Sequence, residues 1–258
     1  MATMIDLSGK TILLTGASKG IGAATAAILG AAGAHLVAHY GSDRAGVEAA
    51  TAAIPPERLL LVQADLADLD AVERLWAAAL AWRGRIDVLV NNAAIMDFSG
   101  GFDAPLAVWD LVWEQALDVN VKAPARLMRN AVNHYLQAGG GSIITISSWA
   151  AQRGVTNPAT IAYGASKAAV RSATQSIARA YARDNILAYI VTPGVVRTRL
   201  SEQFAATQGG EDKISATLAS GEWVSPEELG RLVAFLASGA VPQMSGATID
   251  VNGASYVR

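Results

Sequence analysis

The chain has 258 residues, of which 52% are hydrophobic and 16% charged, and its formal net charge is −2. This length suits one α/β domain with a sizeable core, and the apolar content excludes extended disorder. Low charge and the lack of a Lys/Arg run argue against nucleic acid as a ligand. The absence of cysteine excludes disulfides, thiolate zinc sites and a Cys nucleophile, and fits a cytoplasmic location. Residues 1–10 lack a basic stretch followed by an apolar one, and no apolar run reaches membrane-spanning length, so we predict neither signal peptide nor membrane span.

Short apolar runs alternate with helical patterns along the chain. Strands are predicted at 12–15, 35–39, 59–64, 86–91, 142–147, 186–192 and 247–251. Helices are predicted at 23–32, 44–53, 68–82, within a long segment from 105 to 138, at 161–182 and at 226–237. This alternation is typical of a single doubly wound, Rossmann-type α/β domain: a seven-stranded parallel sheet with helices on both faces. We expect residues 1–258 to form that one domain.

The longest irregular stretch runs from 197 to 223 and carries Gly209-Gly210 with few regular cues. A long loop in a compact domain is often an active-site lid, and we expect a substrate loop at about 195–224. A mobile surface excursion is the open alternative.

A glycine-rich turn follows the first predicted strand and precedes an Ala-rich helix. It reads Gly16-Ala17-Ser18-Lys19-Gly20-Ile21-Gly22. In this order the free N–H groups and the helix dipole point at a phosphate. Gly16 permits the tight turn, Gly20 lets the backbone approach a pyrophosphate, and Gly22 allows close helix packing. An ordinary turn is the alternative, which the position between strand and helix makes the weaker interpretation.

Several other predicted strands end in polar or turn-forming residues, namely Asp65, Asn91-Asn92, Ser147-Ser148 and Pro193-Gly194. Singly, Asp65 could cap a helix and Asn91 could bond a turn. Because ligands bind beyond the carboxyl ends of parallel strands, the set together predicts a binding site at that edge.

Tyr163 and Lys167 lie four apart in a predicted helix, so both side chains rise from one face. An ammonium beside a phenol lowers the pKa of the phenol, which can then exchange a proton with a carbonyl or alcohol oxygen. The pair alone is weak, because a surface Tyr over a Lys is common.

Taken together, these motifs resemble the short-chain dehydrogenase/reductase family over nearly the whole chain. The matching motifs are Thr15-Gly16-x-x-x-Gly20-x-Gly22, Asp65, Asn91-Asn92-Ala93, Asn120, Ser148, Tyr163-x-x-x-Lys167 and Pro193-Gly194. Two departures are small. The usual Asn-Asn-Ala-Gly ends here in Ala94, and the segment from Ser148 to Tyr163 is slightly longer than in many members. Ser147 is the fallback for Ser148, although strand alternation turns it to the other face.

The resemblance implies four catalytic residues. Tyr163 would be the general acid/base, and Lys167 would lower its pKa, as would the positive nicotinamide, and would hold the nicotinamide ribose. Ser148 would donate a hydrogen bond to the substrate oxygen. Asn120 would seat a water that links Lys167 to solvent, with a satisfied core amide as the alternative.

The resemblance also implies a nicotinamide cofactor. Its binding residues would be Gly16, Ser18, Lys19, Gly20, Ile21, Gly22, Tyr40, Arg44, Asp65, Leu66, Asn92, Ala93, Tyr163, Lys167, Pro193, Gly194, Val196 and Thr198. NAD-selective sheets end the second strand in an acid, and Tyr40 stands at that position. Lys19 and Arg44 could pair with a phosphate dianion, which favours NADP. Asp43 keeps NAD possible.

The substrate pocket is expected to be mainly apolar. Its residues would be Ser148, Trp149, Ile95, Met96, Val155 and Phe204, near Val196. The three histidines show no metal-ligand spacing, so no metal site is predicted.

The sequence therefore predicts a cytoplasmic NADP-dependent oxidoreductase acting on a secondary alcohol or ketone by a Ser-Tyr-Lys-Asn mechanism. The alternatives are an NAD-dependent alcohol dehydrogenase of the same family, a non-catalytic nucleotide sensor, and a nucleotide-sugar epimerase or dehydratase. A sensor would have lost a catalytic residue, and a nucleotide-sugar enzyme usually carries a longer C-terminal part. Fold does not fix the substrate.

The resemblance further implies a homotetramer built on the helices around 112–135 and 161–182. The second helix offers the small residues Ala165, Ala169, Ser172, Ala173 and Ser176 for close approach. The alternative is that this face packs on the sheet of its own chain. The terminal strand would supply a second contact and D₂ symmetry.

Overall fold

The apolar runs form one parallel sheet in the order β3-β2-β1-β4-β5-β6-β7. The strands are β1 (Thr11–Leu14), β2 (His35–Tyr40), β3 (Leu59–Gln63), β4 (Val88–Asn91), β5 (Gly141–Ile146), β6 (Ile186–Pro193) and β7 (Thr248–Val251). This computed structural model describes residues 5–257, so the expectation for residues 1–10 falls partly outside the described residues. The predicted fold class is confirmed.

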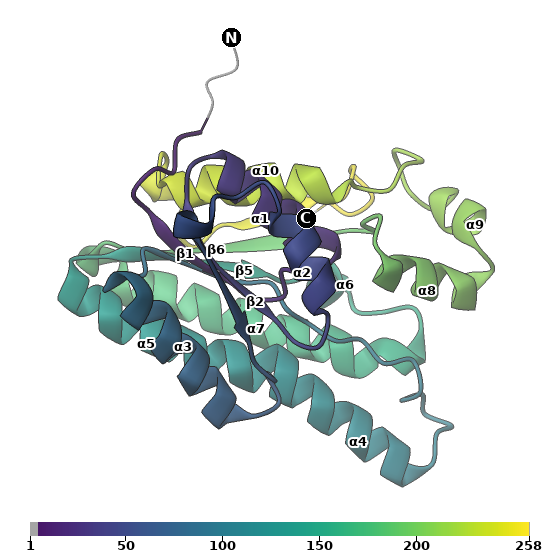
Figure 1. Cartoon of the computed structure of the whole chain (residues 1–258). Coiled ribbons are helices and arrows are strands. Elements are labelled where there is room, and N and C mark those ends of the chain that lie inside the picture. Colours follow the sequence, from purple (N-terminus) through teal and green to yellow (C-terminus); the bar gives the residue numbers. More distant parts are fainter. Residues whose placement is uncertain (1–4, 258) are drawn as a thin grey trace.

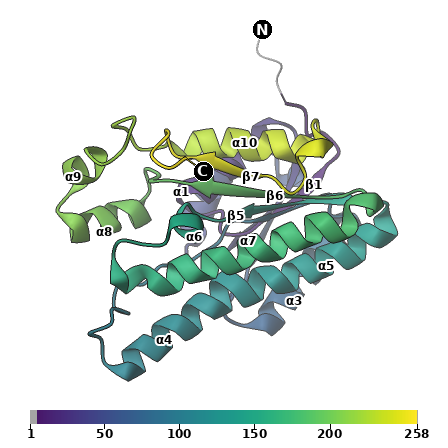
Figure 2. The same ribbon diagram turned by 180° about the vertical axis from the view of Figure 1, so that it is seen from behind.

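Helices cover both faces of the sheet (Figure 1). One face carries α1 (Gly20–Ala31), α2 (Arg44–Thr51) and α10 (Pro226–Ser238). The other carries α3 (Leu69–Arg83), α4 (Leu106–Leu117), α5 (Ala123–Ala138) and α7 (Ile161–Tyr181), and Figure 2 shows α4, α5 and α7 side by side below the sheet. Short 3₁₀ turns lie at Pro56–Arg58, Pro158–Thr160, Ala182–Asp184 and Pro242–Met244. In the described part of the chain, no helix has the length and apolarity needed to span a bilayer.

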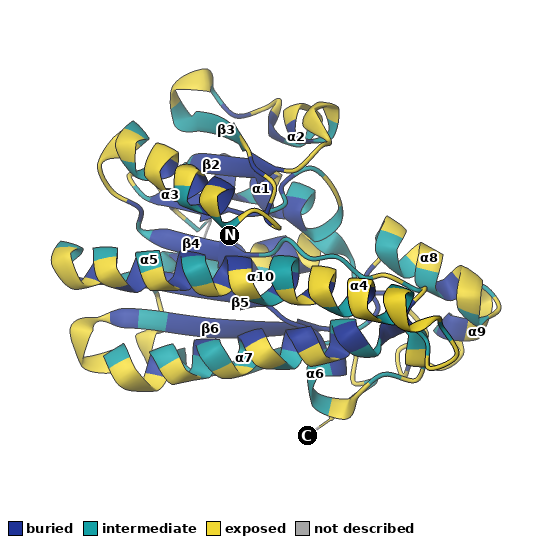
Figure 3. Ribbon diagram, turned by 90° about the horizontal axis from the view of Figure 1, so that it is seen from below, coloured by how far each residue is buried: buried dark blue, intermediate teal, exposed yellow. Residues whose placement is uncertain are grey.

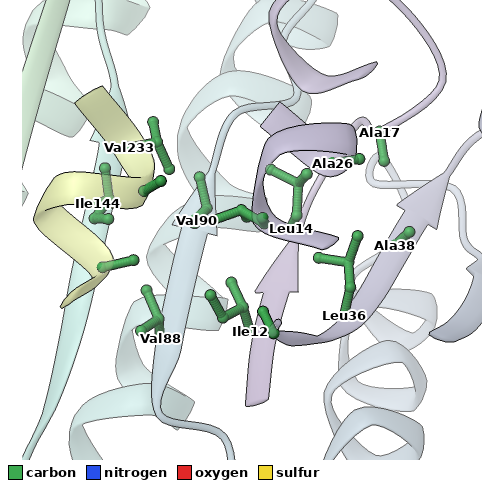
Figure 4. Packing of buried hydrophobic residues seen from close by; sticks show 14 of the residues in the cluster. Ile12, Leu14, Ala17, Ala26, Leu36, Ala38, Val88, Val90, Ile144 and Val233 are labelled. Atoms are coloured by element: carbon green, nitrogen blue, oxygen red, sulfur yellow. The ribbon is translucent and has the colours of Figure 1, made fainter. Parts of the chain in front are cut away.

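Strand alternation divides the core into two layers. Ile12 and Leu14 of β1 pack with Ala26 of α1 and Val233 of α10 on one side (Figure 4). Leu13 packs on the other side, in the cluster under α3 and α5. The inner strands β1, β2, β4, β5 and β6 are therefore buried on both faces, β3 and β7 at the sheet edges are half-buried, and the helices expose their outer sides (Figure 3).

The long helical segment from 105 to 138 is interrupted. A π-helical turn, Asp118–Lys122, separates α4 from α5 and contains Asn120. Such turns widen a helix locally and are frequent at functional sites. A short helix that we did not predict, α6 (Ala150–Arg153), follows β5.

The expectation of an irregular stretch at 197–223 is wrong. This segment folds into α8 (Arg199–Gln208) and α9 (Glu211–Ser215), which project from the rest of the molecule in Figure 1. It has its own apolar cluster, formed by Val195, Ala205, Ile214, Leu218 and Trp223. A parallel bridge between Val196 and Val224 joins its two ends, with Val224 N–H donating to Val195 O at 2.9 Å. We call residues 195–224 the lid.

Candidate active site

The glycine turn brings α1 close to the end of β4. Gly16 and Gly20 both adopt positive φ, +71° and +55°, which favours glycine. A Cβ on Gly22 would lie 1.9 Å from Gly16 O and 2.6 Å from Asn92 Nδ2, so only glycine fits there. Within the described residues no side chain caps α1 at Lys19, and the first residues of the helix line a cleft. The turn therefore offers N–H donors and a helix dipole that fit the diphosphate of a dinucleotide.

Hydrogen bonds from β4 hold this turn in place. Asn92 Nδ2 donates to Thr15 O at 2.8 Å and to Gly16 O at 3.1 Å. Thr15 Oγ1 accepts the N–H groups of Asn92 at 3.0 Å and Ala93 at 3.1 Å. The side chain of Asn92 is thus used to shape the glycine turn.

The cleft has a volume of about 1030 Å³ and runs from the glycine turn to Tyr163 and Lys167. The predicted site residues that line it are Gly16, Lys19, Gly20, Ile21, Gly22, Asn92, Ala93, Ile95, Met96, Ser148, Tyr163, Lys167, Pro193, Gly194, Val196 and Thr198. Sequence reasoning missed the lid residues Arg197, Arg199, Glu202 and Gln203, which also line it. Threonine is a common residue at a helix N-cap, and Thr198 caps α8 by accepting Ser201 N–H. This feature of the sequence could have indicated the helix on which these residues lie.

Three of the predicted substrate residues are not among those that line this cleft. Trp149 and Phe204 pack against the apolar cluster of the lid. Val155 lies against α7, where its Cγ1 is 3.0 Å from the position that a Cβ on Gly164 would take. These three residues therefore pack against other parts of the protein and do not form the surface of the cleft.

The predicted adenosine side lies beyond the cleft and comprises Ser18, Tyr40, Arg44, Asp65 and Leu66. Arg44 pairs with Glu48 at 2.8 Å and lies near Tyr40. The side chain of Leu66 is buried in the core, which leaves its backbone for a ligand.

Asp43, the residue that kept NAD open, is engaged elsewhere. Its carboxylate accepts Gly46 N–H at 2.9 Å and so caps α2, while its carbonyl accepts the Ser18 hydroxyl at 2.8 Å. Lys19 is exposed and, in the part of the chain described, forms no ion pair.

The geometry distinguishes the two serines at the end of β5. The Ser148 side chain lies beside Tyr163, whose pKa it lowers, and accepts Ala150 N–H at 3.1 Å. Ser147 faces α7, where its hydroxyl donates to Lys167 O at 2.8 Å. Ser148 is therefore the serine beside the phenol.

Lys167 carries a buried amine. It is 4% exposed, its Nζ donates to Ile146 O at 2.8 Å, and Nζ lies 5.8 Å from the centroid of the Tyr163 ring. Burial lowers the pKa of Lys167 to about 8. Burial also raises the pKa of Tyr163, and the nearby Ser148 hydroxyl lowers it by less. Burial is therefore the largest effect on the phenol pKa in the protein alone, and the lowering by Lys167 and the nicotinamide stays a prediction for the complex with cofactor.

Asn120 joins three segments through its side chain. Its Nδ2 donates to Ile95 O at 2.9 Å and to Ser166 Oγ at 3.0 Å, and its Oδ1 accepts Ile95 N–H at 2.9 Å. Ser166 Oγ in turn donates to Tyr163 O at 2.7 Å. The side chain is a satisfied buried amide that ties the loop after β4 to the catalytic helix.

The histidines lie apart from this chemistry. His39 bonds backbone groups, His134 Nε2 accepts Ile86 N–H at 3.2 Å, and His35 contacts Trp82 edge to face. The described residues contain no group of three His, Asp or Glu side chains placed to hold a metal ion.

Comparisons with known proteins agree with this architecture. A family model described as enoyl-(acyl carrier protein) reductase matches residues 16–254. The chain is 34% identical to the Bos taurus protein named dehydrogenase/reductase SDR family member 4, over 99% of this chain and 90% of that protein. A Beutenbergia cavernae structure described as a putative NAD(P)-dependent gluconate 5-dehydrogenase with bound NADP is 33% identical, with a TM-score of 0.86 and 98% of each chain covered. The Brucella melitensis 3-ketoacyl-(acyl-carrier-protein) reductase complexed with NADH is 28% identical, with a TM-score of 0.85, covering 98% of this chain and 100% of that chain.

The fold and the cleft define a dinucleotide-binding oxidoreductase of CH–OH groups that uses a nicotinamide cofactor. The chain belongs to the short-chain dehydrogenase/reductase family, as its motifs predicted.

Replacing Lys167 by Met should stabilise the fold while removing activity. The pKa of Lys167 falls from 10.5 to about 8, so burying its charged form costs folding free energy, at about 1.4 kcal/mol for each pKa unit. Allowing for the lost bond to Ile146 O, we expect a gain of about 2 kcal/mol at pH 7. Below pH 8 the cost is fully present, and it disappears as pH rises from 8 to 10.5.

Thermal unfolding at pH 7 and pH 10 measures this difference. The gain should shrink at the higher pH, and Lys213→Met, at an exposed lysine of α9, should show no gain at either. An unchanged or lower melting temperature for Lys167→Met at pH 7 would contradict the prediction.

Proposed function

We propose that the protein is an NADP-dependent oxidoreductase that interconverts a secondary alcohol and a ketone. The observation that carries the proposal is that Ser148, Tyr163 and the buried Lys167 line the same end of the cleft that starts at the glycine turn. This arrangement supports proton transfer to or from one substrate oxygen.

Each of the four residues has its own role in the proposed reaction. The nicotinamide, when bound, supplies or accepts the hydride. Ser148 donates a hydrogen bond to the substrate oxygen and fixes its position. In the reducing direction, Tyr163 gives its phenolic proton to that oxygen. The buried ammonium of Lys167 stabilises the phenolate that results. A water beside Asn120 would return a proton from solvent through Lys167.

The proposed preference for NADP rests on charge at the end of β2. Tyr40 replaces the acid that would repel a ribose phosphate, and Asp43 is engaged as the cap of α2. Lys19 is exposed at the glycine turn, and Arg44 lies at the start of α2 beside Tyr40. Lys19 forms no ion pair among the described residues, and Arg44 would exchange its exposed pairing with Glu48 for the phosphate, so the two cations favour a phosphate dianion.

The alternatives have weaker support. If the protein is an NAD-dependent alcohol dehydrogenase of the same family, the cofactor has no ribose phosphate, and Arg44 would stay paired with Glu48 when the cofactor is bound. A non-catalytic nucleotide sensor does not explain why all four catalytic residues are kept. The relatives are named for steroid, sugar-acid and sugar substrates, so membership of the family does not identify the alcohol on which this protein acts. We also propose a cytoplasmic location, because a sequence without cysteine fits a reducing compartment.

Tyr163→Phe should reduce turnover by at least about a hundredfold while cofactor binding persists. The change removes the phenolic proton and leaves the ring, and general acid/base catalysis contributes about 10²- to 10⁴-fold. A panel of ketones with NADPH, followed by nicotinamide absorbance, identifies a substrate and measures the loss. Tyr181→Phe, at the far end of the same helix, is the matched control. Near-normal turnover by Tyr163→Phe would refute the catalytic assignment.

NADPH should bind more tightly than NADH, and Lys19→Ala should remove much of the difference. Loss of one charge-assisted contact to the phosphate costs about 1.5–3 kcal/mol, or about 10- to 100-fold in affinity. Fluorescence titration of both cofactors measures this. Lys10→Ala, which precedes β1 at the opposite edge of the sheet, should change neither affinity. Tighter binding of NADH by the unaltered protein would overturn the preference.

We further propose a homotetramer that pairs α4, α5 and α7 with a second copy. Ala165, Ala169, Ser172 and Ser176 form an exposed face of α7, whereas Ala173 packs on the core of its own chain. Packing on the sheet of the same chain therefore accounts for Ala173 but not for the four exposed residues. Nearby α4 and α5 expose Leu106, Leu111, Leu117 and Leu136 by 37% to 73%. Small residues flanked by exposed leucines suit a close helix–helix contact.

Light scattering should give a mass about four times the chain mass of 26.7 kDa. Ala169→Glu should lower this mass without unfolding the protein, because it places a charge on the paired face. Ala180→Glu, near the exposed end of the same helix, controls for added charge. A monomer that persists with cofactor present would rule out the assembly.

A further inference from the structure

His39 joins three segments that are distant in sequence. It lies in β2 next to Tyr40 and is 2% exposed. Its ring Nδ1 accepts the N–H of Gly16 at 3.1 Å, and its Nε2 lies 3.1 Å from Ala64 O. Its own backbone carbonyl accepts Ala17 N–H at 2.8 Å. One residue thus holds the first two amides of the glycine turn and the end of β3.

The partners fix the protonation state of the ring. Gly16 N–H can only donate, so Nδ1 must present its lone pair. Ala64 O can only accept, so Nε2 must carry the hydrogen. A proton added at Nδ1 would face the Gly16 N–H and leave two donors opposed in a buried site. The observed contacts therefore require the neutral imidazole.

We propose that His39 is a positioning residue for the cofactor, and that it acts only in its neutral form. Gly16 opens the turn that would hold the diphosphate, and Ala64 precedes Asp65 on the adenosine side. By bonding both, the imidazole sets the distance between the diphosphate and adenosine parts of the cofactor site. The inference rests on the proposed place of the cofactor over the glycine turn.

The surroundings favour the neutral ring. The charged groups on the elements packed around it are Lys19 of the turn, Asp65 after β3, and Asp68 and Asp70 at the start of α3, and all are exposed. Asp65 accepts Ala67 N–H and Asp68 accepts Asp70 N–H, so these carboxylates serve their own turns. Burial lowers the pKa of His39, and the bond to Ala64 opposes this only partly. The stability that the neutral ring confers is present above pH 6.5 and is lost as pH falls through the lowered pKa.

Two substitutions separate the two bonds. Asn at position 39 can place an amide oxygen where Nδ1 lies, keeping the acceptor for Gly16 and giving up Ala64. Gln can reach Ala64 with its amide nitrogen and leaves Gly16 N–H without an acceptor. Neither side chain titrates. Calorimetric titration with NAD⁺ from pH 5 to 8 is the test, because NAD⁺ lacks the phosphate monoester that titrates near pH 6. Melting temperatures at pH 8 show that each variant folds.

For the unaltered protein we expect NAD⁺ affinity to be constant above pH 6.5 and to weaken severalfold in acid. His39→Asn should bind within about threefold of the unaltered protein at pH 8 and lose the acid weakening. His39→Gln should bind about tenfold more weakly at every pH, since a buried N–H loses its acceptor. Tighter binding in acid, an acid weakening that survives in His39→Asn, or normal affinity in His39→Gln would each overturn the inference.

Lys19→Ala, titrated with NADP⁺, separates this inference from the function it rests on. If Lys19→Ala weakens binding and the His39 variants behave as the unaltered protein does, only the role of His39 fails. If neither Lys19→Ala nor His39→Gln affects any cofactor affinity, the proposed place of the cofactor fails as well.

Discussion

Everything at the site depends on the parallel direction of the seven strands. Parallel strands end at one edge, and each return crossing through a helix brings the next strand end to that edge. Asn92, Ser148 and Gly194, which are far apart in sequence, therefore line one cleft with the glycine turn. The close approach at that edge requires Gly22, since any side chain there would collide with Gly16 O.

The same edge holds groups that cost folding free energy. Lys167 buries an amine that donates a hydrogen bond to the carbonyl of Ile146. Gly16 and Gly20 occupy positive φ, and both side-chain atoms of Asn91 are buried without a hydrogen-bond partner in the described structure. A site made for stability would carry apolar residues at positions 91 and 167 and a less constrained turn at 16–20. Groups that cost folding free energy are expected to concentrate at functional sites, and here they lie beside the cleft.

Local patterns made much of the fold readable from the sequence, and long-range contacts hid the rest. Tyr163 and Lys167 are one helical turn apart, so spacing alone placed them together. The lid was misjudged because its helices are short and pack on a small cluster that forms only when Val195 and Trp223 meet. His39 carried no signal: its partners lie 23 and 25 residues away, and an isolated histidine in an apolar strand looks like ordinary core.

The lid contacts the rest of the cleft through Thr198 and Trp149, which bears on how substrate preference could change. The methyl group of Thr198 packs against Gly20, and Trp149 packs between the Pro193–Gly194 turn and the lid cluster. The rest of the lid packs on itself and on the C-terminal segment, where Ser255 Oγ accepts Ala219 N–H at 3.1 Å, and its two ends meet at the Val196–Val224 bridge. Sequence changes within α8 and α9 can therefore reshape the cleft wall without disturbing the Ser148–Tyr163 pair or the glycine turn. Proteins about one-third identical to this chain are named for different substrates, and a lid that can change independently of Ser148 and Tyr163 would allow such differences on one fold.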